Sequence, residues 1–341
     1  MIPHNRPTLG SEEEQAALKV IRSGFLSQGP EVESFENEFC NFMGLPIGHA
    51  VAVSNGTAAL FLSLWALNAQ NKQIVFPGYV CAALRHAVNM INGHEKLVDI
   101  DSHSPNMSLD KLKNTNSDIA IIPHMYGIPI DLTDMKNEKI IEDCAQALGA
   151  KIKGEKVGLQ GTLGIFSFYA TKMITSGGEG GMIVSKDKNL INSIKDYRKF
   201  DFRHDDKKRF NFQMTDLQAS IGREQLKKLP YFIQRREEIF NKYKNSCSYE
   251  FLDIDPKHSD TIQPVRYRAI IKTKIPKKII STLESKGVHT IIPTEDWEIL
   301  GDNKLFPNSL KLAHETVSLP IYPSLTDEEI EIIVTELNKI S

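Results

Sequence analysis

Apolar residues recur at helical spacing near the start of the chain, and the pattern then changes. The segment GSEEEQAALKVIRSGFLSQGP, which SQGP ends, and residues 31–44 have apolar side chains every three to four positions, which predicts two amphipathic helices. From residue 50 to about residue 190, short apolar runs such as HAVAVSN, QIVFP and GGMIVS alternate with helical segments such as GTAALFLSLWAL. This alternation predicts an α/β fold with a mostly parallel mixed sheet flanked by helices.

The last third of the chain has a different pattern. Residues 216–246 predict a long amphipathic helix, which we expect to be broken at Pro230 because proline removes a backbone donor. A strand at VRYRAIIKT and helices at PKKIISTLESKG and TDEEIEIIVTELNKI follow. We therefore predict two domains: an N-terminal arm with a large α/β domain over residues 1–230, and a smaller α+β domain over residues 231–341.

Composition narrows the class of protein. The chain has 341 residues, 41% of them hydrophobic, and a formal net charge of -2, which favours a globular protein over a nucleic-acid or membrane-surface binder. No apolar run approaches the roughly 18 residues of a membrane span, and the polar N-terminus predicts no targeting peptide. Four scattered cysteines predict neither a disulfide framework nor a metal site, so we expect a reducing cytoplasm.

A glycine opens the helix that follows the first strand, in SNGTAAL (residues 54–60). The backbone N–H groups of Gly56, Thr57 and Ala58 lie at the positive end of that helix, where anions bind. Such a turn is also an ordinary strand-to-helix connection. The motif alone therefore has two interpretations, a phosphate site or an ordinary connection between a strand and a helix.

Asp143 ends the apolar run IIED, in IIEDCAQALGA. Ligands of open α/β sheets bind beyond the carboxyl ends of strands, and a buried carboxylate there needs a cationic or hydrogen-bonding partner. An alternative role for Asp143 is to cap the next element.

One lysine, Lys172, follows the run GIFSFYA and precedes a glycine-rich stretch. Ser167 lies five residues before it, and the pair Gly180–Gly181 lies eight and nine residues after it. A desolvated lysine forms Schiff bases with carbonyl groups. Any single lysine is more often a solvated surface group, so this assignment depends on the neighbouring motifs.

Taken in order, the three segments resemble the DegT/StrS-type sugar aminotransferases, a family that uses pyridoxal 5'-phosphate (PLP) and has the aspartate-aminotransferase fold, fold type I. The similarity runs from SGFLSQGPEVESFE through HMYGIPIDL and NFQMTDLQASIGREQLKKL to SLPIYPSLTDEEI. It implies PLP as the cofactor. It also implies transfer of an amino group from L-glutamate, released as 2-oxoglutarate, to a nucleotide-linked keto sugar in surface polysaccharide or O-antigen synthesis.

The resemblance implies a role for each site residue. Lys172 is the catalytic residue that forms a Schiff base with PLP and moves the proton. Asp143 pairs with the pyridinium nitrogen, and Gln146 lies near the phenolic oxygen. An asparagine of the neighbouring subunit, Asn211, reaches the phosphate, so the enzyme is expected to be a homodimer with a shared site. Within one subunit, the expected phosphate-binding residues are Gly56, Thr57, Ala58 and Ser167.

The sequence departs from the family pattern at Cys81, around Asn211, where Phe210 and Gln213 replace a glycine and an arginine, and near residue 290. Cys81 stands where an aromatic residue usually stacks on the cofactor ring, and Tyr79 is the alternative source of an aromatic face. The segment FDFRHDDKKRF (residues 200–210) contains Arg203, Lys207, Lys208 and Arg209, which either contact a diphosphate or form a solvated charge run. Many relatives have a His- and Tyr-rich loop where this chain has GVHTIIPTEDWEILGDN. His289 and Trp297 of this segment either contact the substrate or have a structural role.

Three alternative functions are open to comparison. A PLP-dependent sugar dehydratase of the same fold has histidine in place of the lysine, and Lys172 argues against it. Loss of the lysine or the aspartate would favour a non-catalytic PLP-binding regulator. This chain has both residues, which argues against that alternative. A Rossmann-type nucleotide binder needs G-x-G-x-x-G after the first strand, which this chain lacks.

Overall fold

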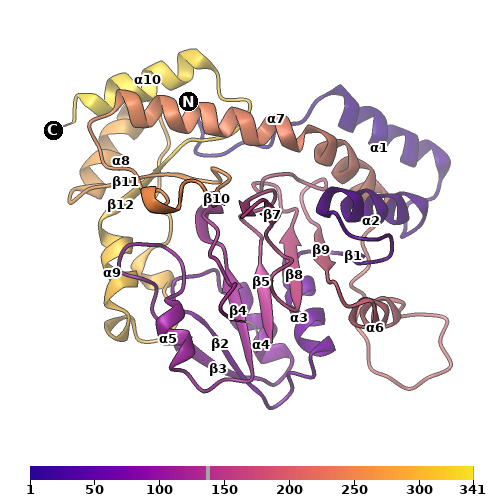
Figure 1. The fold of residues 1–341 in the computed structure, drawn as a ribbon. Coiled ribbons are helices and arrows are strands. Elements are labelled where there is room, and N and C mark those ends of the chain that lie inside the picture. The colour runs from indigo at the N-terminus through magenta and orange to yellow at the C-terminus, as the bar shows by residue number, and fades with distance from the viewer. Residues whose placement is uncertain (136–138, 341) are drawn as a thin grey trace.

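A mixed β-sheet forms the centre of the molecule (Figure 1). The computed structural model describes residues 1–135 and 139–340, and within these ranges the sheet has seven strands in the order β1-β9-β8-β5-β4-β2-β3. Only β9 runs against the others, because it pairs antiparallel with both neighbours. The predicted mostly parallel α/β sheet is therefore confirmed. The strands are β1 (Ala50–Val53), β2 (Gln73–Pro77), β3 (His94–Val98), β4 (Ile119–Pro123), β5 (Ile140–Asp143), β8 (Leu163–Ser167) and β9 (Gly181–Val184).

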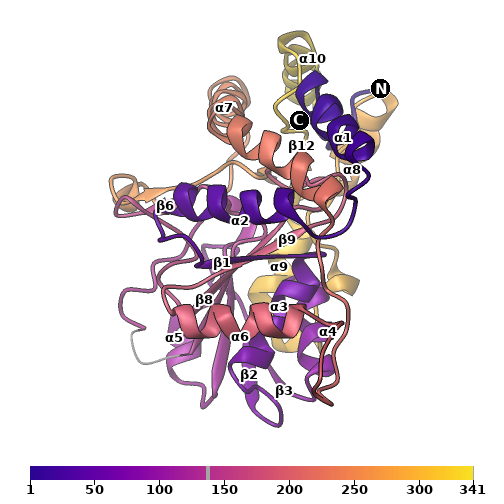
Figure 2. The same cartoon turned by 90° about the vertical axis from the view of Figure 1, so that its right-hand side faces the viewer.

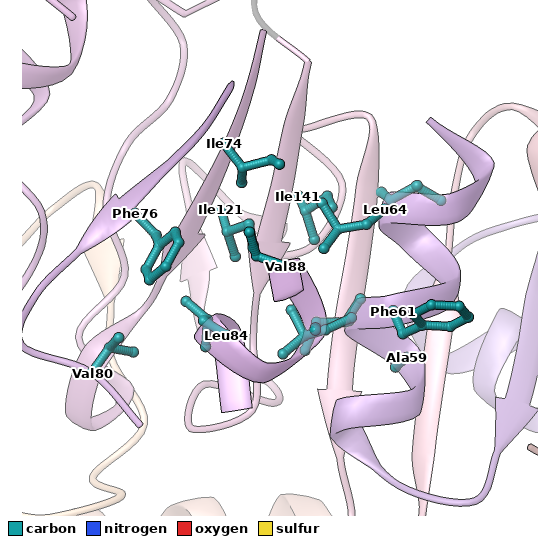
Figure 3. Close-up of a cluster of buried hydrophobic side chains, with 14 of the residues drawn as sticks. Ala59, Phe61, Leu64, Ile74, Phe76, Val80, Leu84, Val88, Ile121 and Ile141 are labelled. Atoms are coloured by element: carbon teal, nitrogen blue, oxygen red, sulfur yellow. The ribbon is translucent and has the colours of Figure 1, made fainter. Parts of the chain in front are cut away.

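Helices cover both faces of this sheet (Figure 2). Along β1, Val51 belongs to the core cluster on one face and Ala52 to the cluster on the other. Figure 3 shows Phe61, Val88 and Ile121 pointing into the first cluster from three different elements. Because both faces are buried, a slip in register would misplace every side chain, so the strand ends are held firmly. The first face is covered by α3 (Gly56–Ala66), α4 (Ala83–Met90) and α6 (Lys188–Arg198), and the second by α2 (Pro30–Met43) and α7 (Asp216–Ser246).

The C-terminal part forms its own small sheet and core. Strands β11 (Ala269–Lys272) and β12 (Thr316–Leu319) pair antiparallel, and α8 (Pro276–Ser285) and α10 (Asp327–Asn338) contribute to the same core. The remaining elements are α1 (Ser11–Ser23), α5 (Leu109–Lys113), α9 (Pro307–His314), β6 (Lys151–Ile152), β7 (Glu155–Lys156) and β10 (Ile262–Gln263). No helix in the described part of the chain is long and apolar enough to cross a membrane.

Helix α7 is continuous over 31 residues, so the predicted break at Pro230 is wrong. Helices α1 and α2 pack along it, and Leu226, Leu229 and Phe232 are buried on both sides of the proline. A proline costs a helix interior about 3 kcal/mol, and burial of these side chains offsets that cost. The expected division into domains at residue 230 falls within this helix and stays a prediction.

Candidate active site

The carboxyl ends of β4, β5 and β8 meet the start of α3 around a cavity of about 460 Å³, here called the strand-end cavity. This is where ligands of open α/β sheets bind. All the predicted site residues except Ala58 and Asn211 line it. The lining residues among them are Gly56, Thr57, Cys81, Asp143, Gln146, Ser167 and Lys172.

Helix α3 begins in the cavity wall. Asn55 is its N-cap, and its side-chain oxygen accepts the backbone N–H of Ala58 at 2.8 Å. Ala58 is buried outside the cavity, whereas Gly56 and Thr57 line it and have first-turn N–H groups without an intrahelical acceptor. A Cβ atom at position 56 would lie 3.0 Å from Cβ of Ser167. Glycine therefore lets α3 approach β8 closely enough for both to face one ligand.

Asp143, the last residue of β5, has a buried carboxyl group at the cavity. Within the described residues it has no ion-pair partner, and Oδ1 accepts the N–H of Ala145 at 3.0 Å. Burial raises the pKa of Asp143, although that hydrogen bond and the charge of Lys172 act in the opposite direction. A ligand that brings a cationic N–H group would stabilise this carboxylate.

The preceding residue, Glu142, anchors the end of β5. Its carboxylate accepts the backbone N–H groups of Gly158, Gln160 and Gly161 at 2.6–2.8 Å and contacts Nε2 of His124 at 3.1 Å. Burial acts to raise the pKa of Glu142, but these hydrogen bonds outweigh it and lower the pKa. These bonds fix the end of β5, the strand from which Asp143 faces the cavity.

His124, Glu142 and Cys144 lie within 4.8 Å of one another, a grouping that metals use elsewhere. Nδ1 of His124 accepts the N–H of Ile130 at 3.1 Å, so both ring nitrogens already have partners. Burial raises the pKa of the Cys144 thiol well above its usual value. The group is therefore explained as a buried hydrogen-bonded support for β5.

Lys172 lies between β8 and β9, with its ammonium group 5.4 Å from the centre of the Tyr267 ring. Burial acts to raise the pKa of Tyr267, but the charges of Lys172 and Arg268 and a hydrogen bond with Thr171 outweigh it, so the pKa is lowered. Asn5 donates to the carbonyl oxygen of Thr171 at 3.1 Å. The tyrosine ring and the N-terminal arm together restrict where the lysine nitrogen lies.

Gln146 and Cys81 complete the cavity wall. Oε1 of Gln146 accepts the N–H of Tyr126 at 2.7 Å, which leaves its amide NH₂ group as a donor at the cavity. Cys81 is exposed and lines the cavity. Tyr79 is fully buried, and its hydroxyl accepts a hydrogen bond from Tyr126 at 2.8 Å. Of the two alternatives, only Cys81 reaches the cavity.

Asn211 lies outside the strand-end cavity of its own chain. It is exposed, and its side-chain oxygen accepts the N–H of Gln213 at 3.0 Å. His289 and Trp297 are also exposed and do not line the cavity. The fold of one chain therefore does not bring these three residues to the predicted site.

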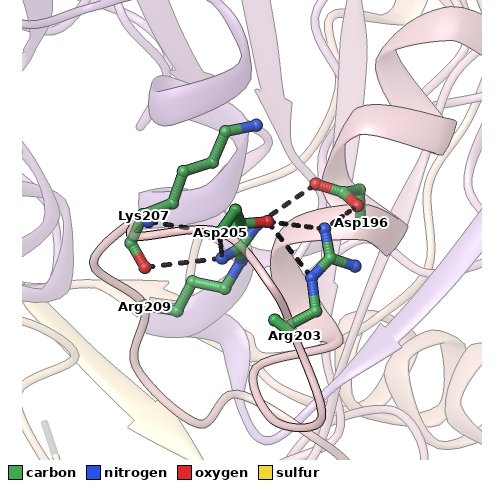
Figure 4. A network of polar contacts seen from close by, with 5 residues as sticks. All are labelled: Asp196, Arg203, Asp205, Lys207 and Arg209. Carbon is green, nitrogen blue, oxygen red and sulfur yellow. Dashed lines mark hydrogen bonds and ion pairs between the residues drawn. The ribbon is translucent and has the colours of Figure 1, made fainter.

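The charged segment 200–210 follows α6 and projects from the body of the molecule (Figure 1). Arg203 and Arg209 form ion pairs with Asp196 and Asp205, as Figure 4 shows. The guanidinium of Arg209, followed by that of Arg203, lowers the pKa of Asp205. The ammonium group of Lys207 lies apart from these pairs. The arginine charges are thus compensated by Asp205 of the segment and by Asp196 of α6.

Residues 7–338 match the model of the DegT/DnrJ/EryC1/StrS aminotransferase family. The chain belongs to this family. It is 29% identical to a GDP-perosamine synthase of Vibrio cholerae, over 97% of this chain and 96% of that protein. It is 28% identical to the spore coat polysaccharide biosynthesis protein SpsC of Bacillus subtilis, over 99% and 97%. The crystal structure of the aminotransferase TlmJ from Streptoalloteichus hindustanus superposes with a TM-score of 0.89 at 25% identity, covering 99% and 98% of the two chains.

PLP is the cofactor of this aminotransferase family, and the chemistry of the strand-end cavity fits it. The unpaired buried carboxyl of Asp143 suits a pyridinium N–H, and the start of α3 suits a phosphate. The close approach of Gly56 to Ser167 forms a cradle that a side chain at position 56 would fill. Lys172 reaches the same cavity.

Some residues of the site escaped the sequence prediction. The signal for Asn55 was present, because asparagine before a helix is a favoured N-cap. Tyr267 had no signal, since its contact with Lys172 joins two segments far apart in the chain. The other lining residues that were not predicted include His124, Tyr169, Thr171 and Glu179.

Proposed function

We propose that this aminotransferase transfers the amino group of L-glutamate to a nucleotide-linked keto sugar, in the synthesis of a surface polysaccharide. One observation carries the proposal: Lys172 and Asp143, without ion-pair partners in the described chain, line one cavity with the start of α3. The names of the two relatives support a sugar as the acceptor. The lysine itself disfavours the dehydratase and regulator alternatives.

The residues of the cavity have distinct tasks in this reaction. PLP, when bound, supplies a carbonyl carbon that receives the amino group and a ring that takes up the electron pair released at the donor Cα. Nζ of Lys172 removes the proton from that Cα and later returns a proton to the sugar carbon. Asp143 holds the proton on the ring nitrogen. Gly56, Thr57 and Ser167 bind the phosphate.

The absorption spectrum of the PLP-loaded protein tests the reaction class. We expect a yellow band that L-glutamate converts to the pyridoxamine phosphate form, with one equivalent of 2-oxoglutarate released. A nucleotide-linked keto sugar should then restore the yellow band, whereas the same sugar without the nucleotide should do so much more slowly. A protein that binds no PLP would contradict the proposal, and restoration by neither sugar would contradict its acceptor.

We also propose a homodimer in which Asn211 of one subunit completes the site of the other. Its exposed position outside its own cavity supports this arrangement. Mixing Lys172→Ala with Asn211→Ala chains tests it, because a mixed dimer then holds one site with both residues intact. Random mixing should restore about a quarter of wild-type activity. If Asn211→Ala alone is fully active, or if the mixture stays inactive, the shared site is wrong.

A further inference from the structure

The N-terminal arm covers a second, much smaller cavity, here called the arm cavity. Its volume is about 10 Å³, and it lies between residues 6–8, the Lys172 segment and α7. That is room for about one water-sized particle, too little for a carboxylate or a phosphate. Lys172 lines both this cavity and the strand-end cavity, so the two cavities are neighbours that share this residue.

Two residues of the arm cavity have buried polar atoms that find no hydrogen-bond partner among the described residues. They are Nε of Arg236 and Oγ1 of Thr8. Buried polar groups nearly always have a partner, which is a protein atom, a water or an ion, so these two atoms mark a place for a small hydrogen-bonding ligand. The Nε–H group donates only, and the threonine hydroxyl is also a donor.

No acidic side chain of the described residues forms an ion pair with Arg236. The residue is only 1% exposed, and burial lowers its pKa to about 10, which still leaves it charged at neutral pH. Nη1 donates to the carbonyl oxygens of Arg266, Tyr267 and Ile321, which carry partial charges only. A buried guanidinium without a counter-ion is costly.

The rest of the lining adds positive charge. Arg6 contributes to the wall, and no aspartate or glutamate of the described residues does. The amide of Gln225, a further polar side chain there, already donates to the carbonyl oxygen of Thr8 at 2.9 Å and to Glu13 at 2.7 Å. The cavity is therefore lined by hydrogen-bond donors and positively charged side chains. Such a lining binds an anion rather than a cation.

We propose that the arm cavity binds a single halide ion, ordinarily chloride, between Nε of Arg236 and Oγ1 of Thr8. The size of the cavity excludes polyatomic anions, and its donors and charges favour an anion over neutral water. The halide serves as the counter-ion of Arg236 and ties the N-terminal arm to α7 behind the catalytic lysine. The site is independent of which sugar the enzyme uses.

Crystals of the PLP-loaded enzyme grown in sodium bromide test the location directly. We expect an anomalous bromide peak within hydrogen-bond distance of Nε of Arg236 and Oγ1 of Thr8. Density for a water without an anomalous signal, or bromide peaks only elsewhere on the protein, would overturn the proposal.

Thermal unfolding in solution gives a second test, in sodium chloride or sodium gluconate at equal ionic strength. We expect chloride to raise the Tm of the holoenzyme by about 2 °C, because a ligand that binds only the folded state stabilises it. Thr8→Val should lose that response. The control is Thr290→Val, which removes another buried hydroxyl without a partner, outside this cavity, and should keep the response. An equal Tm in both salts, or a full response in Thr8→Val, would refute the halide site.

Discussion

The strand-end cavity and the segment 200–210 both bring charged residues together, but they leave those charges in different states. In the cavity, Asp143 and Lys172 have no ion-pair partner in the described chain, although the fold holds each in place. In the segment, Arg203 and Arg209 are paired with nearby aspartates (Figure 4). Charges that a fold keeps unpaired at a cavity indicate a ligand, whereas charges that pair with one another indicate local order.

The largest expected effect is that of Lys172→Ala. Without the amine, the donor half reaction should slow by on the order of 10⁴-fold, because proton transfer loses its base. Single-turnover absorbance with L-glutamate measures it. The matched control is Lys207→Ala, which removes an exposed lysine of segment 200–210 and should react at nearly the wild-type rate. Substantial turnover by Lys172→Ala would contradict the catalytic role of this lysine. It would also remove the functional difference between the strand-end cavity and segment 200–210.

Asp143→Asn should have the next largest effect, a loss of about 100-fold or more in the same half reaction, because the ring nitrogen loses its charged partner. Binding of the cationic ring requires the ionised carboxylate, and burial raises the pKa of Asp143. PLP affinity of the wild type should therefore fall as the pH drops through that pKa, and affinity of the variant should change less. Titrations of apoenzyme with PLP at several pH values measure both. Asp205→Asn serves as the control from the paired segment.

Tyr267→Leu tests the ring beneath the lysine. Loss of a cation–π contact of about 1–2 kcal/mol should lower kcat roughly tenfold while the KM for glutamate stays the same. Tyr267→Phe keeps the ring and should retain most of the rate. Equal defects in the two variants would instead assign the effect to the hydroxyl group.

Cys81→Phe tests the departure from the family's aromatic position. An aromatic ring against the cofactor should tighten PLP binding about threefold to tenfold, since such contacts contribute about 0.5–1.5 kcal/mol. Equilibrium dialysis of PLP measures the change. Weaker binding would mean that the cavity is shaped around the smaller thiol side chain.

The smallest effect is expected from Lys207→Ala combined with Lys208→Ala. These exposed lysines should change the KM for the sugar nucleotide by about twofold at low salt and not at all at high salt, because screening removes such interactions. Steady-state kinetics at two ionic strengths measure it. A tenfold increase in KM would give this segment a direct part in substrate binding.

The strand-to-helix rhythm predicted the fold class well because each buried strand and amphipathic helix has a local pattern of its own. The same reasoning failed at Pro230, because α7 packs against α1 and α2 before the proline and in the C-terminal core after it, and this packing outweighs the local preference of proline. The sequence also places Ala58 among the phosphate donors, and the structure shows that its N–H group donates to the side-chain oxygen of Asn55. Both cases depend on contacts whose strength a short stretch of sequence does not reveal.

The sequence by itself determined the family, the cofactor and the residue types that the chemistry needs, because their order along the chain is specific. Only the tertiary structure decided which of these residues share a cavity, and that Cys81 rather than Tyr79 lines it. It also decided that Tyr267 lies against Lys172 and that the buried Arg236 is bonded to backbone carbonyls and to no acid of the described residues. These facts depend on how distant segments pack, and burial and charge compensation are properties of that packing.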